Sequence, residues 1–256
     1  MTVRGGQCNA RPGWVSVCDA GASPIGYYFA MRDRPLKFAA VLQALKEHYG
    51  SPDPLPTHDP FELILLENVA YLAPPARRRD AFAMLRREVG LSPADILAAS
   101  PAALQRVTAH GILKARFADK LRACARIALE VLGADFHSVI HGPLPKAKKA
   151  LRRFPGIGEP GADKILLFAG AQNLLAPDSN ALRVLARLGL IAEDKSYARM
   201  YASSRELGAK PARKIGAMQE AHLLLQTHGQ TLCKRNAPLC GACPLATRCP
   251  HILYSR

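Results

Sequence analysis

The sequence predicts an all-α protein, and two observations support this fold class. From residue 36 onward, apolar residues recur three and four positions apart, as in Phe38, Val41, Leu42 and Leu45. This spacing places them on one face of a helix. No convincing stretch of the chain alternates polar and apolar residues between turn residues, which is the pattern of a strand. We therefore expect helices that pack on helices, without a sheet.

The first 34 residues differ from the rest, because they have no sustained period and are interrupted by Gly, Pro and Ser. We expect an irregular arm here. Its apolar stretch is short and broken, which does not fit a secretion signal. A helix is then expected from Leu36 to Tyr49. A proline-rich loop separates it from a strongly apolar helix, Phe61 to Leu72, which Pro74 and Pro75 end.

Further helices are expected in the middle and later parts of the chain. One covers about Arg79 to Val89. Ser92 and Ser100 each precede a proline, and a serine in this place caps a helix whose first position is the proline. The spacing of three and four residues continues from Leu121 to Val131 and from Leu182 to Leu188.

The composition narrows the class of partner. The 35 Lys and Arg exceed the 20 Asp and Glu, which gives a formal net charge of +15. Clustered cations gain affinity for phosphates by releasing counterions, so a nucleic acid is the first expectation. The alternative is a basic protein that does not bind nucleic acid. Charged residues interrupt every apolar run before the ~20 residues that a membrane-spanning helix needs, so we expect no membrane partner.

Four of the seven cysteines lie within the last 24 residues in the pattern C-x6-C-x2-C-x5-C: Cys233, Cys240, Cys243 and Cys249. This crowding indicates a metal site and not a secreted disulfide framework. Zinc modules usually contain two C-x2-C pairs, and this segment has one. The spacing therefore favours a [4Fe–4S] cluster as cofactor, with a structural zinc ion as the alternative. The sequence assigns no role to Cys8, Cys18 or Cys124.

A turn with two closely spaced glycines joins two helical stretches at Phe154-Pro155-Gly156-Ile157-Gly158. Small residues let backbone N–H groups approach an anion, and the helix that follows directs its positive dipole end the same way. We expect a phosphate to bind at Gly156, Ile157 and Gly158. Many tight helix–helix turns have similar sequences, so a purely structural turn is the alternative.

Glu67 places a carboxyl group in a strongly apolar helix, after Leu63-Ile64-Leu65-Leu66. If this carboxyl faces a cavity, burial raises its pKa and it can protonate a leaving group. The alternatives are a position on the helix surface and an internal pair with an arginine.

The cysteine spacing, together with the preceding run from Ala221 to Gly229, resembles the iron–sulfur segment of the endonuclease III family of helix-hairpin-helix DNA glycosylases. Pro177 to Arg187 is similar to the aspartate-bearing segment of that family, and Gly111 to Arg116 resembles its other turn and helix. The resemblance covers about residues 36 to 251. It implies a two-lobe helical fold with the active site between the lobes, and excision of a damaged or mismatched base from double-stranded DNA.

The resemblance also implies roles for single residues. Asp178 would be the catalytic carboxylate, which stabilises the positive charge that develops on the sugar as the N-glycosidic bond breaks and orients a water molecule. A plain helix cap is the alternative for this aspartate. Asn180 would lie at the DNA. Lys234 and Arg235 would contact its backbone, with a solvated basic loop as the alternative.

One departure from the family concerns the nucleophile. Bifunctional members carry a lysine where this sequence has Pro160, and proline has no amine for Schiff-base chemistry. We therefore expect a monofunctional glycosylase and doubt any AP lyase activity. Lys164 is the alternative nucleophile, although one helical turn displaces its amine by ~5 Å. The alternative from a different functional class is a protein that binds DNA or abasic sites without catalysing a reaction.

Within the family, Glu67 aligns with the catalytic glutamate of the monofunctional branch that acts on adenine and on mismatches. The segment after Asp178 also resembles that branch. The segment from Asn68 to Leu72 lacks the glutamines that follow this glutamate in the adenine enzyme. The sequence therefore leaves the excised base open.

The predicted organisation has three parts. Residues 1–34 form the arm, and residues 61–178 form a helical domain with the helix-hairpin-helix at about 147–170. Residues 36–60 and 179–256 together form a discontinuous cluster domain. We expect a monomer that works in the bacterial cytoplasm, or in the nucleus of a eukaryotic cell, and is not secreted.

Overall fold

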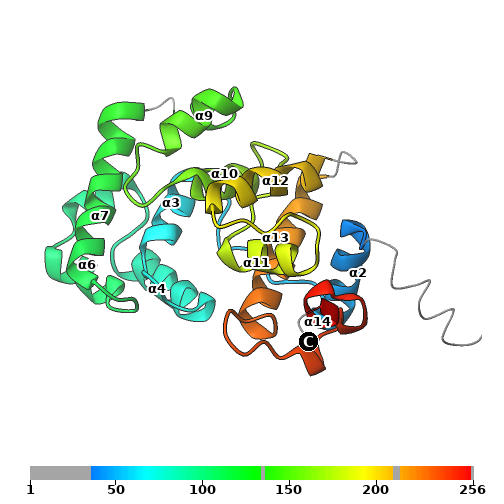
Figure 1. The fold of residues 1–256 in the computed structure, drawn as a ribbon. Coiled ribbons are helices and arrows are strands. Elements are labelled where there is room, and N and C mark those ends of the chain that lie inside the picture. Colours follow the sequence, from blue (N-terminus) through cyan, green and yellow to red (C-terminus); the bar gives the residue numbers. More distant parts are fainter. Residues whose placement is uncertain (1–35, 134–135, 210–213, 255–256) are drawn as a thin grey trace, which may run out of the picture. The chain divides into compact units, whose positions relative to one another are not determined.

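The structure is a computed structural model that describes residues 36–133, 136–209 and 214–254 (Figure 1). Every regular element in these residues is helical, which confirms the predicted all-α class. The predicted arm, residues 1–34, lies outside the described residues, as do Cys8 and Cys18. A search of the described helices finds none that is both long and apolar enough to span a membrane.

The helices follow one another with short connections. Their bounds are α2 (Phe38–Tyr49), α3 (Pro60–Asn68), α4 (Pro75–Glu88), α5 (Pro93–Ala98), α6 (Pro101–Thr108), α7 (Lys114–Arg126) and its π-helical continuation (Ile127–Leu132), α8 (Phe136–Ile140), α9 (Leu144–Leu151), α10 (Glu159–Phe168), α11 (Ser179–Arg187), α12 (Tyr197–Ala209), α13 (Ile215–Thr231) and α14 (Pro250–Tyr254). Two single 3₁₀ turns, Cys240–Ala242 and Ala246–Arg248, lie in the cysteine loop.

Most helix starts agree with the sequence. The Ser92 and Ser100 hydroxyls cap α5 and α6, accepting the N–H groups of Asp95 and Ala103 at 3.1 Å each. The apolar helix predicted to reach Leu72 ends at Asn68, because a turn follows in which Leu72 has a φ of 55°. Helix α4 begins at Pro75, four residues before the predicted start at Arg79, because a proline at the first helical position needs no N–H for the helix.

The core is centred on helices that are buried on more than one side. In α3, the residues from Leu63 to Leu66 are at most 3% exposed, and the helix packs on α4, α7 and α10. Cys124 of α7 belongs to the same core, and burial raises the pKa of its thiol to about 12, so it is an inert packing residue.

Two segments far apart in the sequence lie side by side at the other end of the described chain. α13 packs on α11 and on α2, the first described helix (Figure 1). The Tyr49 hydroxyl at the end of α2 lies 3.0 Å from both the Nδ1 of His228 and the hydroxyl of Thr231 on α13. These contacts suit a domain made of the 36–60 and 179–256 segments, whose exact bounds stay a prediction.

The hairpin between α9 and α10 depends on a glycine. Gly156 has a φ of 85°, and a Cβ atom built there would lie 2.5 Å from the Oδ1 of Asn68. Asn68 is itself 1% exposed and donates its amide to the carbonyl of Ile64 at 3.1 Å. The hairpin therefore rests directly on α3, and no side chain fits between them.

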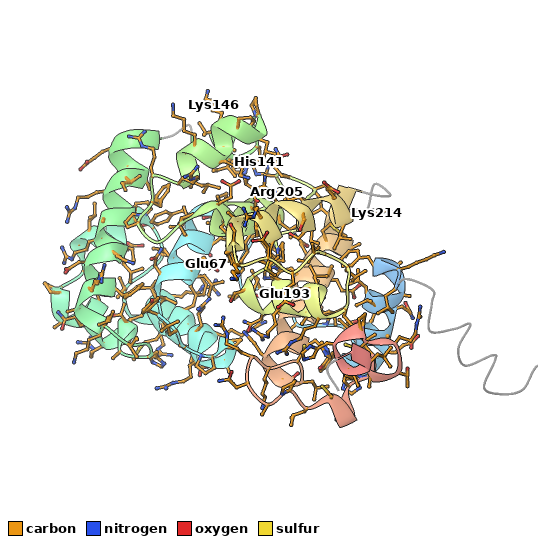
Figure 2. All side chains as sticks on the ribbon, viewed as in Figure 1. Glu67, His141, Lys146, Glu193, Arg205 and Lys214 are labelled. Atoms are coloured by element: carbon orange, nitrogen blue, oxygen red, sulfur yellow. The ribbon has the colours of Figure 1, made fainter. Side chains whose placement is uncertain are left out.

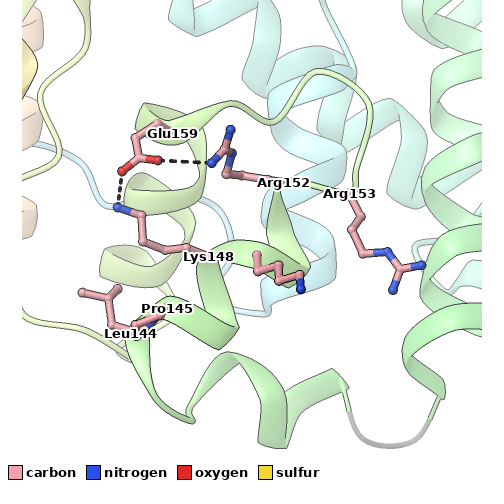
Figure 3. Close-up of a pocket in the computed structure, with 7 residues that line it drawn as sticks. Leu144, Pro145, Lys148, Arg152, Arg153 and Glu159 are labelled. Atoms are coloured by element: carbon pink, nitrogen blue, oxygen red, sulfur yellow. Dashed lines mark hydrogen bonds and ion pairs between the residues drawn. The ribbon is translucent and has the colours of Figure 1, made fainter. Parts of the chain in front are cut away.

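Buried charges fix the two hairpin helices to α12. Asp163 of α10 is 1% exposed, and its carboxylate is contacted by Lys148 of α9 at 2.7 Å and by Arg205 of α12 at 3.0 Å. It also accepts the hydroxyl of Tyr201 at 2.8 Å. Lys148 binds Glu159 as well, at 2.6 Å, beside an open cavity of about 480 Å³ (Figure 3). A buried carboxylate with this many donors holds the three helices in one arrangement.

We predict that Gly156→Ala lowers stability more than Gly170→Ala. Both glycines have a positive φ, 85° and 73°, but the Cβ built at Gly170 meets nothing within 4 Å. Gly170→Ala therefore costs only the backbone strain, about 1–2 kcal/mol. Gly156→Ala adds the contact with Asn68, roughly 1–3 kcal/mol more. Urea unfolding of both variants measures the difference, and equal losses would show that the hairpin moves away from Asn68 freely.

Candidate functional site

Asp178 is the N-cap residue of α11. Its Oδ1 accepts the backbone N–H of Ala181 at 2.8 Å, and its Oδ2 accepts the side-chain amides of Gln226 at 2.8 Å and of Asn180 at 3.2 Å. Burial raises the pKa of Asp178, but these hydrogen bonds outweigh burial and hold it below its ordinary value. Asp178 is therefore an ionised carboxylate at neutral pH. It caps the helix and also lines the cavity beside it.

That cavity has a volume of about 330 Å³. Asp178, Asn180 and Lys164 line it together, so the fold brings three of the predicted site residues to one place. The remaining lining comes from α3, α4, α11, α13 and the adjoining loops, and includes Leu66, Leu72, Arg78, Leu223 and Gln226. Polar and charged side chains make up half of this lining and apolar side chains the rest, which suits a flat organic ring that also forms hydrogen bonds.

Glu67 is held by a lysine. Its Oε1 lies 2.7 Å from the Nζ of Lys164, and the two side chains are 21% and 13% exposed. Figure 2 labels Glu67 on α3. Burial raises the pKa of Glu67, but the charges of Lys164 and Arg78 lower it further, so that it lies below its ordinary value. The internal pair considered for Glu67 is therefore present, with a lysine as its partner in place of an arginine, and the raised pKa expected for a carboxyl that faces a cavity is not found.

Pro160 occupies the second position of α10, directly after Glu159. Lys164 follows one turn further along, and it lines the Asp178 cavity while it binds Glu67. An amine is therefore present at the cavity, but an ion pair occupies it. Among the described residues that line this cavity, Lys164 is the one lysine.

Three further residues belong to this site, and the sequence did not single them out. His222 is 1% exposed, and its Nδ1 lies 2.6 Å from the carbonyl of Ala176, which can only accept. Burial and the charge of Lys164 lower the pKa of His222 to about 4, so the ring is neutral at pH 7. Arg78 contributes positive charge from α4, and Gln226 orients Asp178. A histidine or glutamine in an amphipathic helix gives no periodic signal that could have revealed these contacts.

Exposed apolar side chains lie at the cavity mouth and in an adjoining loop. Leu72 is 70% exposed and lines the cavity, with a φ of 55°. The loop before α7 lies against the same turn, because Ile112 donates its N–H to the carbonyl of Tyr71 at 3.2 Å. Ile112 and Leu113 are 53% and 52% exposed, and Leu113 also has a positive φ, 57°. Leucine in left-handed backbone is strained, and such strain is concentrated at functional sites.

The hairpin offers backbone donors on its surface. Gly156 and Gly158 are exposed, and their N–H groups have no acceptor among the described residues. Ile157 differs, because its side chain is 5% exposed and its N–H donates to the carbonyl of Phe154 at 3.1 Å. Its part in the predicted phosphate site is therefore to fix the turn, and the two glycines present the donors. Arg153, labelled in Figure 3, adds an exposed cation at the same end of α9.

The four predicted ligands come together around one small, largely apolar cavity, which Cys233, Cys240, Cys243 and Cys249 line with His228. N–H groups point at two of the sulfur atoms: Arg187 lies 3.5 Å from the Sγ of Cys233, and the backbone N–H of Leu245 lies 3.4 Å from the Sγ of Cys243. In the described part of the chain, no three His, Cys, Asp or Glu side chains are placed as ligands to one metal ion. The donor set and the N–H···S contacts nevertheless fit a thiolate-bound iron–sulfur group.

Two arginines of α11 join the Asp178 site to the cysteine loop. Arg183 donates to the carbonyls of Gly229 at 2.6 Å and Cys233 at 2.9 Å, and to the side chain of Asn180 at 3.0 Å. Arg187 donates to the carbonyl of Lys234 at 2.7 Å and to that of Arg235 at 3.1 Å. With these carbonyls turned inward, the side chains of Lys234 and Arg235 are exposed to solvent.

No family model matches the chain. A candidate DNA repair glycosylase of Methanocaldococcus jannaschii is 32% identical over 95 residues, which cover 37% of this chain. The chain spans 41% of the length of that curated relative.

Solved structures match over much more of the chain. Endonuclease III, trapped on DNA as a covalent intermediate, has a TM-score of 0.64 at 20% identity and covers 85% of this chain and 98% of its own. A thermostable thymine-DNA glycosylase has a TM-score of 0.66 at 16% identity, covering 84% and 96%. The H. pylori 3-methyladenine DNA glycosylase MagIII, bound to 1,N6-ethenoadenine, has a TM-score of 0.57 at 16% identity, covering 77% and 99%. The chain therefore has the helix-hairpin-helix fold of these DNA glycosylases, as the resemblance of its sequence implied.

Proposed function

We propose that this protein is a base-excision-repair DNA glycosylase that hydrolyses the N-glycosidic bond of a damaged or mismatched nucleotide in double-stranded DNA. The observation that carries the proposal is the ionised Asp178 carboxylate, which three hydrogen bonds hold at the wall of a 330 Å³ cavity. The shared fold and the exposed N–H groups of the hairpin agree with it.

The proposed reaction breaks the bond between the sugar C1′ and the base nitrogen. The bonding electrons leave with the base, which gains a proton, and positive charge develops on the sugar. Asp178 stabilises this charge by its own negative charge and accepts a hydrogen bond from the water that attacks C1′. The water loses a proton as the C–O bond forms, and the products are a free base and an abasic site. Glu67 can protonate the base only after its pair with Lys164 is broken, because the pair stabilises its carboxylate.

The target nucleotide must leave the helix stack to reach Asp178. We propose that the cavity receives the flipped base. Leu72 and Ile112, exposed at the mouth and in the adjoining loop, enter the gap that the base leaves, as apolar side chains do in other DNA-bending proteins. The N–H groups of Gly156 and Gly158, with Lys234 and Arg235 on the cysteine loop, bind the phosphates and hold the duplex over the cavity.

We predict that Asp178→Asn abolishes base release and leaves DNA binding unchanged. Asparagine can keep the helix cap, since its side-chain oxygen can accept the N–H of Ala181, but it removes the charge, which should lower the rate constant by about 10²-fold or more. The measurement is single-turnover excision on a panel of damaged and mismatched duplexes, with alkali to reveal abasic sites. Asp59→Asn is the matched control, because Asp59 caps α3 through Glu62 and does not line the cavity. A panel without any product from the native protein would favour the catalytically silent DNA-binding protein.

We also propose that the protein is monofunctional, with Pro160 in place of the lysine of bifunctional glycosylases and Lys164 engaged by Glu67. Borohydride should therefore trap no covalent adduct with DNA. Lys164→Met and Glu67→Gln are examined in parallel with the native protein. An adduct that forms with the native protein and disappears in Lys164→Met, with folding retained, would identify Lys164 as a nucleophile and the protein as a glycosylase with AP lyase activity.

We propose that Cys233, Cys240, Cys243 and Cys249 bind a [4Fe–4S] cluster, which when present holds the cysteine loop in shape and supplies no step of the hydrolysis. The support is the cysteine spacing, the common cavity and the N–H···S contacts. We predict about four iron and four sulfide per chain in anaerobically prepared protein, lost in Cys240→Ala and retained in Cys124→Ala. Stoichiometric zinc without iron would contradict this proposal and support the structural zinc site.

The proposed partner is duplex DNA, and the proposed active form is a monomer. We propose that it acts in the bacterial cytoplasm or in the eukaryotic nucleus, where the DNA is.

A further inference from the structure

A groove runs along the exposed face of α11, next to the Asp178 cavity. Positions 179, 182, 183, 186 and 187 share one helix face, because they are three and four residues apart, and they line a hollow of about 440 Å³. Ser179 lines this hollow and the Asp178 cavity alike. At the other end lies Arg187, which binds the backbone of the cysteine loop. The groove therefore leads from the candidate catalytic carboxylate to the loop that carries Lys234 and Arg235.

The groove is positively charged. Four cations line it: Arg183, Arg187, Lys195 and Arg235. The Lys195 and Arg235 side chains are exposed and form no hydrogen bond or ion pair with any described residue. Two acidic residues line the groove as well. Arg199 neutralises Asp194 with two contacts of 2.8 Å.

The other acidic residue, Glu193, is exposed to solvent beside α11 and is labelled in Figure 2. The four cations therefore outnumber the acidic groups, and an anion is the favoured occupant.

An aromatic ring stands beside these cations. Tyr197 is 44% exposed, and its ring stacks on that of Tyr201 with 6.1 Å between centroids and 15° between planes. Burial and the negative charge of Asp178 raise the pKa of Tyr197, as expected for a phenol next to the cavity. Apolar contact comes from Leu182 and Met200. Proteins bind unpaired nucleotides with exposed aromatic rings and nearby cations, since the base stacks on the ring and the phosphate binds the cations.

We propose that this groove binds a nucleotide next to the excised one on the damaged strand, unpaired from the opposite strand, with its base against Tyr197 and its phosphate bound by Lys195 and Arg235. This inference rests on the proposed function, because it names the path of the substrate strand. The positive charge disfavours an apolar peptide as the occupant, and Ser179, which lines both hollows, shows that the groove adjoins the cavity. The strand then runs from the hairpin past Asp178 to the cysteine loop.

The first test is photo-crosslinking, which needs no catalysis. A duplex carries a tetrahydrofuran abasic analogue, with 5-iododeoxyuridine at one flanking position or the other, and a third duplex carries it six nucleotides away. Irradiation of the native protein should couple one flanking position to Tyr197, identified by peptide mass spectrometry. The distant position should give no adduct at Tyr197. Adducts only at other residues would overturn the proposal.

The second test is affinity for the same abasic-analogue duplex. Tyr197→Ala should weaken binding roughly tenfold, from the loss of one stacked base, and Tyr197→Phe should restore it. Lys195→Ala tests the phosphate contact without disturbing the pair of tyrosine rings, and should reduce the slope of log affinity against log salt by about one. Lys214→Ala removes an exposed cation at the start of α13, outside the groove, and should leave the slope unchanged. Equal slopes for Lys195→Ala and the native protein would overturn the phosphate contact.

These outcomes separate the groove from the proposed activity. Crosslinking at Tyr197 without any base excision on the damage panel would support the groove and contradict the glycosylase. Excision without crosslinking at Tyr197, and with native affinity in Tyr197→Ala, would support the glycosylase and overturn the groove.

Discussion

The arrangement of the site depends on side chains of and next to α11 that form hydrogen bonds with backbone groups. Asp178 does so at the start of the helix, and Arg183 and Arg187 do so further along. At its start, Asp178 accepts the N–H of Ala181, which the helix itself cannot pair. Further along, the guanidinium groups of Arg183 and Arg187 bind carbonyls of the α13 end and the cysteine loop. An arginine presents several donors in a rigid plane, so two side chains are enough to anchor the loop. One short helix therefore sets the position of the carboxylate and of the cysteines together.

The charged groups at and beside the cavity are stabilised by hydrogen bonds and by an ion pair. Asp178 receives hydrogen bonds that favour its ionised form, and Glu67 receives the ammonium of Lys164. His222 contributes no positive charge, because its buried ring is neutral at pH 7. Removing one partner from a buried ion pair leaves the other charge uncompensated, so Glu67 and Lys164 depend on each other. The pair also explains how a lysine can lie at the cavity without a free amine for covalent chemistry.

The hairpin is positioned by contacts of a different kind. Its glycine rests on the amide of Asn68, directly after the residue that pairs with Lys164, so α3 supports the hairpin and lines the approach to the cavity at once. The buried Asp163 then ties α9 and α10 to α12, whose first residue is Tyr197. The same few helices, α3, α9, α10 and α12, therefore position the backbone donors of the hairpin, the cavity and the groove. In the proposed function, this continuity gives the DNA strand one surface to follow.

The sequence by itself determined the features that depend on local pattern. Apolar spacing predicted the helices, Ser92 and Ser100 marked two helix starts, and Gly156 marked a turn that requires a positive φ. Spacing also identified the four cysteines, which the fold brings to one cavity. Each of these follows from neighbouring residues, because helix periodicity, caps and turns are local effects.

Only the tertiary structure decided which groups meet across the chain. The pairing of Glu67 with Lys164, 97 positions apart, reversed the pKa shift that the apolar surroundings of Glu67 suggested. The hydrogen bond from Gln226 to Asp178 and the burial of His222 were equally invisible, since a polar residue in an amphipathic helix does not reveal its partner. The groove along α11 exists because Tyr197 and Arg235, which come from separate segments of the chain, line it together with α11. Burial and long-range charge are properties of the packed chain, and the sequence pattern of one helix contains neither.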